Sequence, residues 1–169
     1  MDRLTVVLIS ALSFFLVGSS VLRGDDERSE ELAAALSSAK VSLEAGLEAA
    51  SAAGKPISAK FEIEESKLQL SVYVSNDGAF SEVIVDHRTG KVSKVELITE
   101  GEDLEEATAQ DQAMAGAKSG LAVVVARVLG TNKRFLVVSA VPAVEGGHPV
   151  VKVTLVKGEN WKTLTEKLD

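Results

Sequence analysis

The sequence predicts an α+β protein made of two tandem units, each a helix followed by an antiparallel meander of strands, behind an N-terminal signal or anchor helix. Two observations indicate this fold. Apolar residues between 29 and 54 recur at helical spacing, whereas those between 57 and 97 alternate as they do in strands. The same order of helix and strands returns about 76 residues later, as the interval from Gly54 to Gly130 shows.

The first segment, residues 1–24, is predicted to be a signal peptide or a membrane anchor. Arg3 precedes an uncharged, mostly apolar run over 4–17, and the small residues at 18–20 suit a signal peptidase. The uncharged run continues to position 22 and approaches the roughly 20 residues of a membrane span, so an uncleaved anchor over 4–22 stays open. Both forms predict an exported protein, periplasmic or extracellular.

Residues 29–98 form the first predicted unit. Ser29 is a candidate N-cap, and the helical pattern stops at Gly54, although Ser42 could restart a second helix after a break near residue 40. Alternation then predicts three or four strands, within 57–63, 68–74, 80–85 and 92–97. The sequence Asn-Asp-Gly at 76–78 predicts a tight turn between the second and third of these strands.

Residues 99–103 are predicted to be an acidic linker, followed by a second unit over 104–169. Asp103 and Glu106 have the spacing of a capping box. The pattern predicts a helix from Leu104 to about residue 129, with a strand competing over the β-branched stretch "LAVVVARVL". The stretches "RFLVVSAV", "VVKVTLV" and "WKTLTEKLD" are predicted strands. The first of these is apolar on both faces and is therefore expected to be covered twice, once by the helix of its own unit and once by the first unit or by a partner.

Composition excludes several classes of function. The net charge of −7 argues against nucleic-acid binding, which needs a surplus of Lys and Arg on some face. The chain has no Cys, so a thiolate nucleophile, a disulfide or a Cys-ligated metal is excluded. The 46% apolar content is sufficient for one or two small cores.

The stretch "FSEVIVDHRTGKV" at 80–92 raises the question of catalysis most directly. The Asp86 carboxylate can accept hydrogen bonds from backbone N–H groups two or three residues later, and Thr89 can add another local bond. Gly90 can take the positive φ that closes the loop. Asp86 and His87 are adjacent, so their side chains point in different directions and do not form a dyad. This stretch is therefore predicted to be a structural turn.

No catalytic, cofactor-binding or metal-binding residue is assigned, and the chain is not expected to be an enzyme. The other histidine is His148, so a two-histidine zinc site would have to bridge the two units and is disfavoured. The glutamate pairs at 64–65 and 105–106 are interpreted as solvated. Phe80 and Trp161, each just after a turn, are predicted to pack in the core.

The segments "GKPISAKFEIE", "LQLSVYV" and "EVIVDHRTGKV" together resemble the PepSY domain, whose pattern closes with VD-x-x-TG-x-V. The second unit resembles it only in degenerate form and lacks the closing TGKV. Members of that family are typically exported, and the domain occurs in propeptides of thermolysin-type metalloproteases. The resemblance implies an exported, non-enzymatic binding module with a protein partner, a peptidase that it inhibits or regulates. The alternative is a structural envelope protein, anchored in the membrane through 4–22, that has no peptidase target.

Overall fold

The structure, a computed structural model, describes residues 24–169. Its helices are α1 (Gly24–Leu36), α2 (Leu43–Ala50), α3 (Gly101–Ala115) and α4 (Leu121–Thr131). Its strands are β1 (Lys55–Glu64), β2 (Lys67–Asn76), β3 (Ala79–Val85), β4 (Val92–Ile98), β5 (Leu136–Glu145), β6 (His148–Lys157) and β7 (Asn160–Lys167). The predicted α+β class is confirmed. The predicted signal or anchor lies outside the described residues, apart from Gly24.

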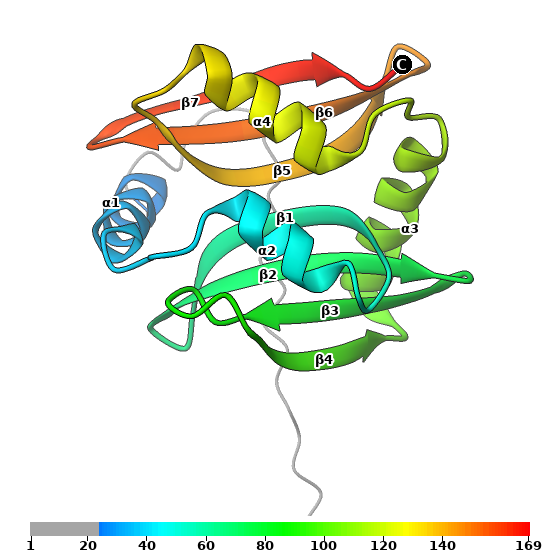
Figure 1. Ribbon diagram of the computed structural model, residues 1–169, viewed down its shortest axis with the longest axis horizontal. Coiled ribbons are helices and arrows are strands. Elements are labelled where there is room, and N and C mark those ends of the chain that lie inside the picture. The colour runs from blue at the N-terminus through cyan, green and yellow to red at the C-terminus, as the bar shows by residue number, and fades with distance from the viewer. Residues whose placement is uncertain (1–23) are drawn as a thin grey trace, which may run out of the picture.

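All seven strands belong to one antiparallel sheet with the order β4-β3-β2-β1-β5-β6-β7 (Figure 1). β1 and β5 join the two halves through only two residue pairs, Ala59 with Ala140 and Lys60 with Ser139. The expectation of a separate sheet in each half was therefore wrong. Each half by itself has two edge strands. Pairing β1 with β5 satisfies backbone groups that would otherwise face water or an edge strand of another molecule, and it leaves β4 and β7 as the edges of the joined sheet.

Helices cover the sheet on both faces. Leu70 of β2 lies against α2, where a Cβ added at Gly46 would come within 2.6 Å of it. Tyr73 on the same strand donates a hydrogen bond to Asp103 of α3. Because residues 70 and 73 differ in parity along one strand, α2 and α3 lie on opposite faces. α4 lies beside α2, so these two helices form the layer in front of the sheet (Figure 1).

The main core lies between the sheet and the layer of α2 and α4. Leu43 and Leu47 from α2 and Val124 and Val125 from α4 are almost completely buried against the strands. Phe80 belongs to the cluster of buried hydrophobic residues and Trp161 is partly buried against that cluster, which confirms the expectation for both. β5 contacts α4 on one face and α3 on the other, so the strand is covered on both sides. Both of these helices belong to the second half, whereas the second cover was expected from the first unit or a partner.

A single helix over 104–129 was wrong, because the structure has α3 and α4 with a break over 116–120. Gly116 ends α3 and Gly120 is the N-cap of α4. The two helices pack on opposite faces of the sheet, so the chain has to pass around the sheet between them. A continuous helix would leave one of the two apolar surfaces in water.

The helix starts show which capping predictions hold. Ser42 is the N-cap of α2, where its Oγ accepts a hydrogen bond from the Ala45 N–H at 3.3 Å, so the predicted restart is confirmed. Ser29 lies inside α1, so it is not a cap. α3 begins at Gly101, within the stretch predicted as a linker, and has Glu100 as its N-cap without a side-chain hydrogen bond. The capping box is therefore wrong, because Asp103 sits inside the first turn.

Candidate functional site

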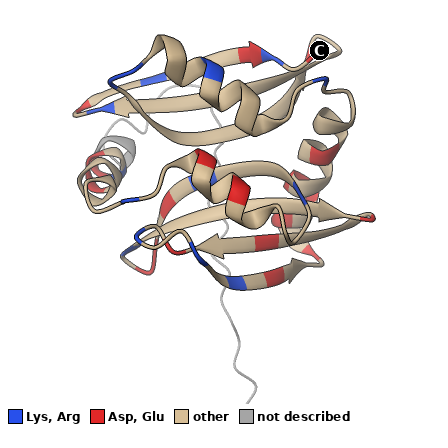
Figure 2. Ribbon diagram, viewed as in Figure 1, with Lys and Arg blue, Asp and Glu red and all other residues tan. Residues whose placement is uncertain are grey.

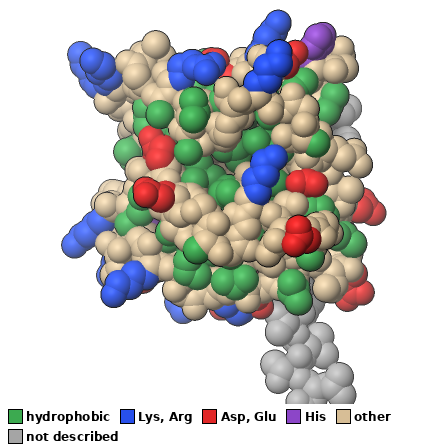
Figure 3. All heavy atoms as spheres, turned by 45° about the vertical axis from the view of Figure 1, so that its right-hand side comes forward, with side chains coloured by type: hydrophobic (Ala, Val, Ile, Leu, Met, Phe, Trp, Pro, Cys, Tyr) green, Lys and Arg blue, Asp and Glu red, His purple; other side chains and the backbone are tan. Residues whose placement is uncertain are grey.

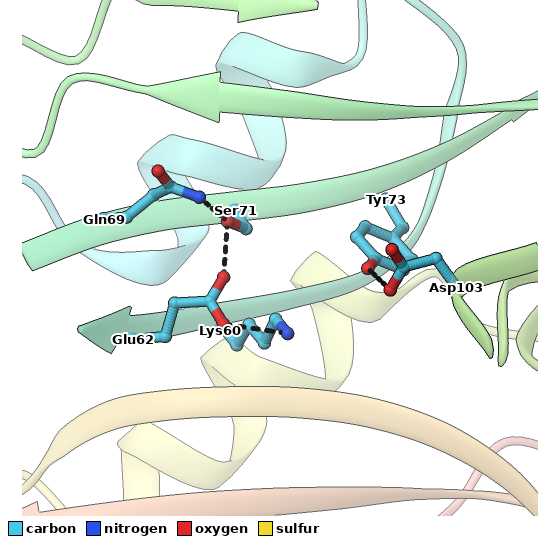
Figure 4. A network of polar contacts seen from close by, with 6 residues as sticks. All are labelled: Lys60, Glu62, Gln69, Ser71, Tyr73 and Asp103. Atoms are coloured by element: carbon cyan, nitrogen blue, oxygen red, sulfur yellow. Dashed lines mark hydrogen bonds and ion pairs between the residues drawn. The ribbon is translucent and has the colours of Figure 1, made fainter. Parts of the chain in front are cut away.

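A cluster of polar side chains occupies the face of the sheet opposite α2 and α4 (Figure 4). β1 contributes Lys60 and Glu62, which are two residues apart and therefore point to the same face. β2 contributes Gln69, Ser71 and Tyr73 by the same alternation. β3 adds Glu82, the cross-strand neighbour of Tyr73, and α3 adds Asp103 and Glu106. We call these eight residues the acidic cluster.

Hydrogen bonds and one ion pair link most of the acidic cluster. Lys60 Nζ lies 2.9 Å from Glu62 Oε2, and Ser71 donates to Glu62 Oε1 at 2.7 Å (Figure 4). Gln69 Nε2 donates to Ser71 Oγ at 2.9 Å. The Tyr73 hydroxyl donates to Asp103 Oδ1 at 2.8 Å, which fixes α3 to the centre of β2. Each of these side chains therefore has a set position.

The acidic cluster holds more negative than positive charge. Its four carboxylates, Glu62, Glu82, Asp103 and Glu106, face the single ammonium of Lys60, so its formal charge is one minus four, or −3, when all are ionised. Figure 2 shows acidic residues along α3 and the neighbouring strands of the first half. An unbalanced cluster on a partly open face is suited to a cationic group from outside.

The pKa values of the cluster show the same imbalance. Burial raises the pKa of Glu82, and the charge of Glu62 raises it further. Burial also raises the pKa of Glu106, and the Asp103 charge adds to the effect. Glu82 and Glu106 therefore bind protons more tightly than ordinary glutamates do. A cation bound beside them would lower their pKa values again.

Lys60 and Tyr73 respond to the same surroundings. Burial alone would lower the pKa of Lys60. The charge of Glu62, the hydrogen bond from Lys60 to Glu62 and the charges of further glutamates together raise this pKa above its usual value. Burial, and then the hydrogen bond to Asp103, raise the pKa of Tyr73. Lys60 Nζ also lies 5.8 Å from the centre of the Tyr73 ring, within the range of a cation–π contact. Both groups thus keep their protons at neutral pH.

The loop at Asp86 is a turn held by its own side chain, as predicted. Asp86 Oδ1 accepts hydrogen bonds from the backbone N–H groups of Arg88 at 2.9 Å and Thr89 at 2.7 Å. These two bonds lower the pKa of Asp86. Gly90 has a φ of +74° and its N–H donates to the Asp86 carbonyl at 2.8 Å. The loop is therefore architectural.

His87 also connects the Asp86 turn to the segment between α1 and α2. Its carbonyl accepts hydrogen bonds from the N–H groups of Lys40 at 2.9 Å and Val41 at 3.1 Å, which ties the α1–α2 connection to this loop. Its Nδ1 is buried without a hydrogen-bond partner among the described residues. The ring lines a groove of about 600 Å³ beside α1. Gln69 lines the same groove, so the groove adjoins the acidic cluster.

The second histidine is held by a different partner. His148 Nδ1 lies 2.8 Å from Asp169 Oδ2, and this hydrogen bond lowers the pKa of Asp169. Within residues 24–169, no three His, Asp or Glu side chains converge as metal ligands. The glutamates at 64 and 65 line the groove, whereas Glu106 belongs to the acidic cluster.

Sequence reasoning placed part of the acidic cluster. Alternation along the strands predicted at 57–63 and 68–74 places Glu62, Gln69, Ser71 and Tyr73 on one face of the sheet, and it also implies Lys60 there. It missed the contribution of α3, since Asp103 was assigned to a cap and Glu106 to solvent. No local pattern signals which strand a surface helix will cross.

Comparison with known proteins adds little. No family model matches the sequence, and no curated protein matches it. The chain is similar to a crystal structure described as that of a candidate lipoprotein from Clostridium difficile 630, with 13% sequence identity and a TM-score of 0.40. The match covers 68% of this chain and 76% of the other. Among the described residues, no helix is long and apolar enough to cross a membrane.

Proposed function

We propose that this protein is an exported, non-enzymatic binding module that holds a cationic side chain of a protein partner in the acidic cluster. The observation that carries the proposal is the formal charge of −3 around Lys60, on a face only partly covered by α3. A guanidinium or ammonium group there would neutralise carboxylates whose pKa values are raised by burial. Gln69 and Ser71 supply further polar contacts beside it.

The resemblance of residues 85–92 to PepSY domains supports a peptidase as that partner. It also supports a description of the chain as two tandem PepSY-like units that share one sheet. In each half an antiparallel meander follows a helix, α2 in the first half and α4 in the second. These two helices pack on the same face of the sheet. The strand order runs outward from β1 in the first half and from β5 in the second. Periplasmic or extracellular location, with or without an anchor over 4–22, belongs to the same proposal.

The test of function uses the exported protein as bait for peptidase activity in an envelope extract. Glu82→Gln with Glu106→Gln removes two charges from the acidic cluster and keeps the shapes of the side chains. The matched control, Glu48→Gln with Glu159→Gln, removes the same charge from exposed positions on α2 and the β6–β7 turn. We expect the wild type and the control to retain peptidase activity and the cluster variant to lose most of it.

Two outcomes would contradict the proposal. Equal retention by the cluster variant and its control would exclude the acidic cluster as the binding surface. Absence of any retained peptidase from the wild type would leave the structural envelope protein as the better interpretation. Cell fractionation tests export separately, because intact, unprocessed protein in the cytosol would refute it.

A further inference from the structure

The edge strand β4 exposes an apolar row at one end of the sheet. β4 pairs only with β3, so its other edge has no partner strand among the described residues. Val92, Val95 and Leu97 are 42%, 51% and 72% exposed, so half of the six exposed large hydrophobics in the described part of the chain lie on this strand. Figure 3 shows apolar side chains gathered along the lower rim of the molecule, where β4 lies in Figure 1. Such an edge invites another strand.

The two faces of β4 differ in chemistry. Val95 pairs with the buried Val83, so Val95 and Leu97 share the face that carries α2. Lys94 and Glu96 lie on the opposite face and form an ion pair at 2.8 Å. The strand therefore presents an apolar stripe on one face and one pair of opposite charges on the other.

This pattern is self-complementary about Val95. Suppose that β4 of a second copy lies antiparallel to this β4, with Val95 facing Val95 of the second copy. The residue numbers of any two facing residues then sum to twice 95. Lys94 then faces Glu96 of the second copy, and Glu96 faces its Lys94. Opposite charges directly across an antiparallel pair are favourable, and apolar residues gain cross-strand contacts on the other face.

We propose that two copies of this chain pair through β4, antiparallel and centred on Val95, into one continuous sheet. The other end of the sheet does not support the same contact, because β7 alternates polar residues and has none of the exposed large hydrophobics. The contact is isologous and closes after two copies. Antiparallel edge pairing keeps equivalent faces on the same side, so the dimer presents both acidic clusters to one partner surface.

Single-cysteine cross-linking tests the register, and the natural chain has no Cys to interfere. Val95→Cys is compared with Val144→Cys, which is on β5 and has a similar exposure of 57% for the wild-type side chain. Directly opposed residues have Cβ atoms about 4.5–5.5 Å apart, close to disulfide distance, while diagonal ones are about 7–8 Å apart. Oxidation in intact cells is followed by non-reducing electrophoresis of the full chain.

We expect Val95→Cys to form a disulfide-linked dimer at least tenfold faster than Val144→Cys. Leu97→Cys should link poorly to itself but readily to Ser93→Cys when the two variants are produced together, since 93 and 97 sum to the same total. Equal rates for Val95→Cys and Val144→Cys would overturn the proposal. A cross-link from position 95 to a different protein, or no cross-link from position 95 at all, would overturn it too.

Charge reversal tests the pairing by an independent route. Lys94→Glu alone and Glu96→Lys alone each place like charges opposite one another in both contacts, whereas the double reversal restores attraction. Sedimentation of the exported protein should show dimerisation weakened about tenfold in each single variant and recovered in the double variant. Mixing the two single variants should also give a dimer. Identical dimerisation in all four samples, or none in the wild type, would refute the arrangement.

Discussion

Gly90 gives the sharpest test of the link between local backbone conformation and stability. Its φ of +74° lies in the left-handed region, which costs an ordinary residue about 1–2 kcal/mol. A Cβ added there would lie 3.6 Å from the nearest Val41 methyl, which is ordinary contact. Steric overlap therefore contributes little, and the cost of Gly90→Ala is the backbone cost alone.

We expect Gly90→Ala to lower the free energy of unfolding by about 1–2 kcal/mol. For a chain of this length the corresponding fall in Tm is roughly 3–6 °C. Gly90→Asn should cost less, because Asn tolerates the left-handed region. The measurement is thermal and denaturant unfolding followed by circular dichroism.

The matched control is Gly130→Ala in α4, where a Cβ would meet nothing within 4 Å and φ is not positive. It should stabilise the protein by up to about 1 kcal/mol, because Gly is the poorer helix former. If Gly90→Ala were neutral or stabilising, or if Asn were worse than Ala at that position, the account of the Asp86 turn would be wrong.

Three further predictions concern the acidic cluster and one close backbone contact. Because burial raises the folded-state pKa of Glu82, the folded chain binds its proton more tightly, so the free energy of unfolding should fall as pH rises from the usual carboxyl pKa through the raised one. Glu82→Gln should flatten that fall in a pH series of denaturant melts and leave the variant at least as stable as the wild type at pH 7; an unchanged slope would contradict this. Tyr73→Phe removes the hydrogen bond to Asp103 and should cost about 1 kcal/mol, whereas Asp103→Asn, which keeps an acceptor, should cost less. The reverse ranking would show that the bond does not hold α3. Gly54→Ala should destabilise the fold in the same melts, since the added Cβ would lie 2.8 Å from the Ser75 carbonyl oxygen; a neutral result would mean that the turn adjusts freely.

Stability and binding are predicted to oppose each other at Glu82. A carboxylate held with a raised pKa costs the free protein stability, so Glu82→Gln should gain stability while it loses the partner. If a residue served only the fold, its substitution would lower stability and binding together or leave both unchanged. Measurement of unfolding and of peptidase retention on the same variant separates these interpretations.

The elements that sequence predicted well are those set by near neighbours. Period-two alternation placed the first four strands, and Asp77 and Gly78, with φ values of +50° and +82°, make the predicted turn. Ser42 starts α2 because its side chain caps the Ala45 N–H. Asp86 fixes its loop within three residues. Each of these depends on contacts a few positions apart, which a single sequence displays.

The errors involve contacts between distant segments. The stretch 104–129 has a helical pattern throughout, and only the need to serve both faces of the sheet makes the chain break at 116–120. The joining of the halves depends on two pairs between β1 and β5, about 80 positions apart, with no local signal. The groove lined by His87 likewise depends on a distant segment, because α1 forms one of its sides.

By itself, the sequence determined the α+β class, most of the strands, the Asp86 turn and the polar character of one face of β1 and β2. These follow from periodicity and turn chemistry, which act over a few residues. Only the tertiary structure decided that the two halves share one sheet, that β4 is left as an exposed apolar edge, and that α3 brings Asp103 to Tyr73. Edge pairing and helix docking depend on the free energies of competing long-range contacts, and alternation along a strand is compatible with several of them.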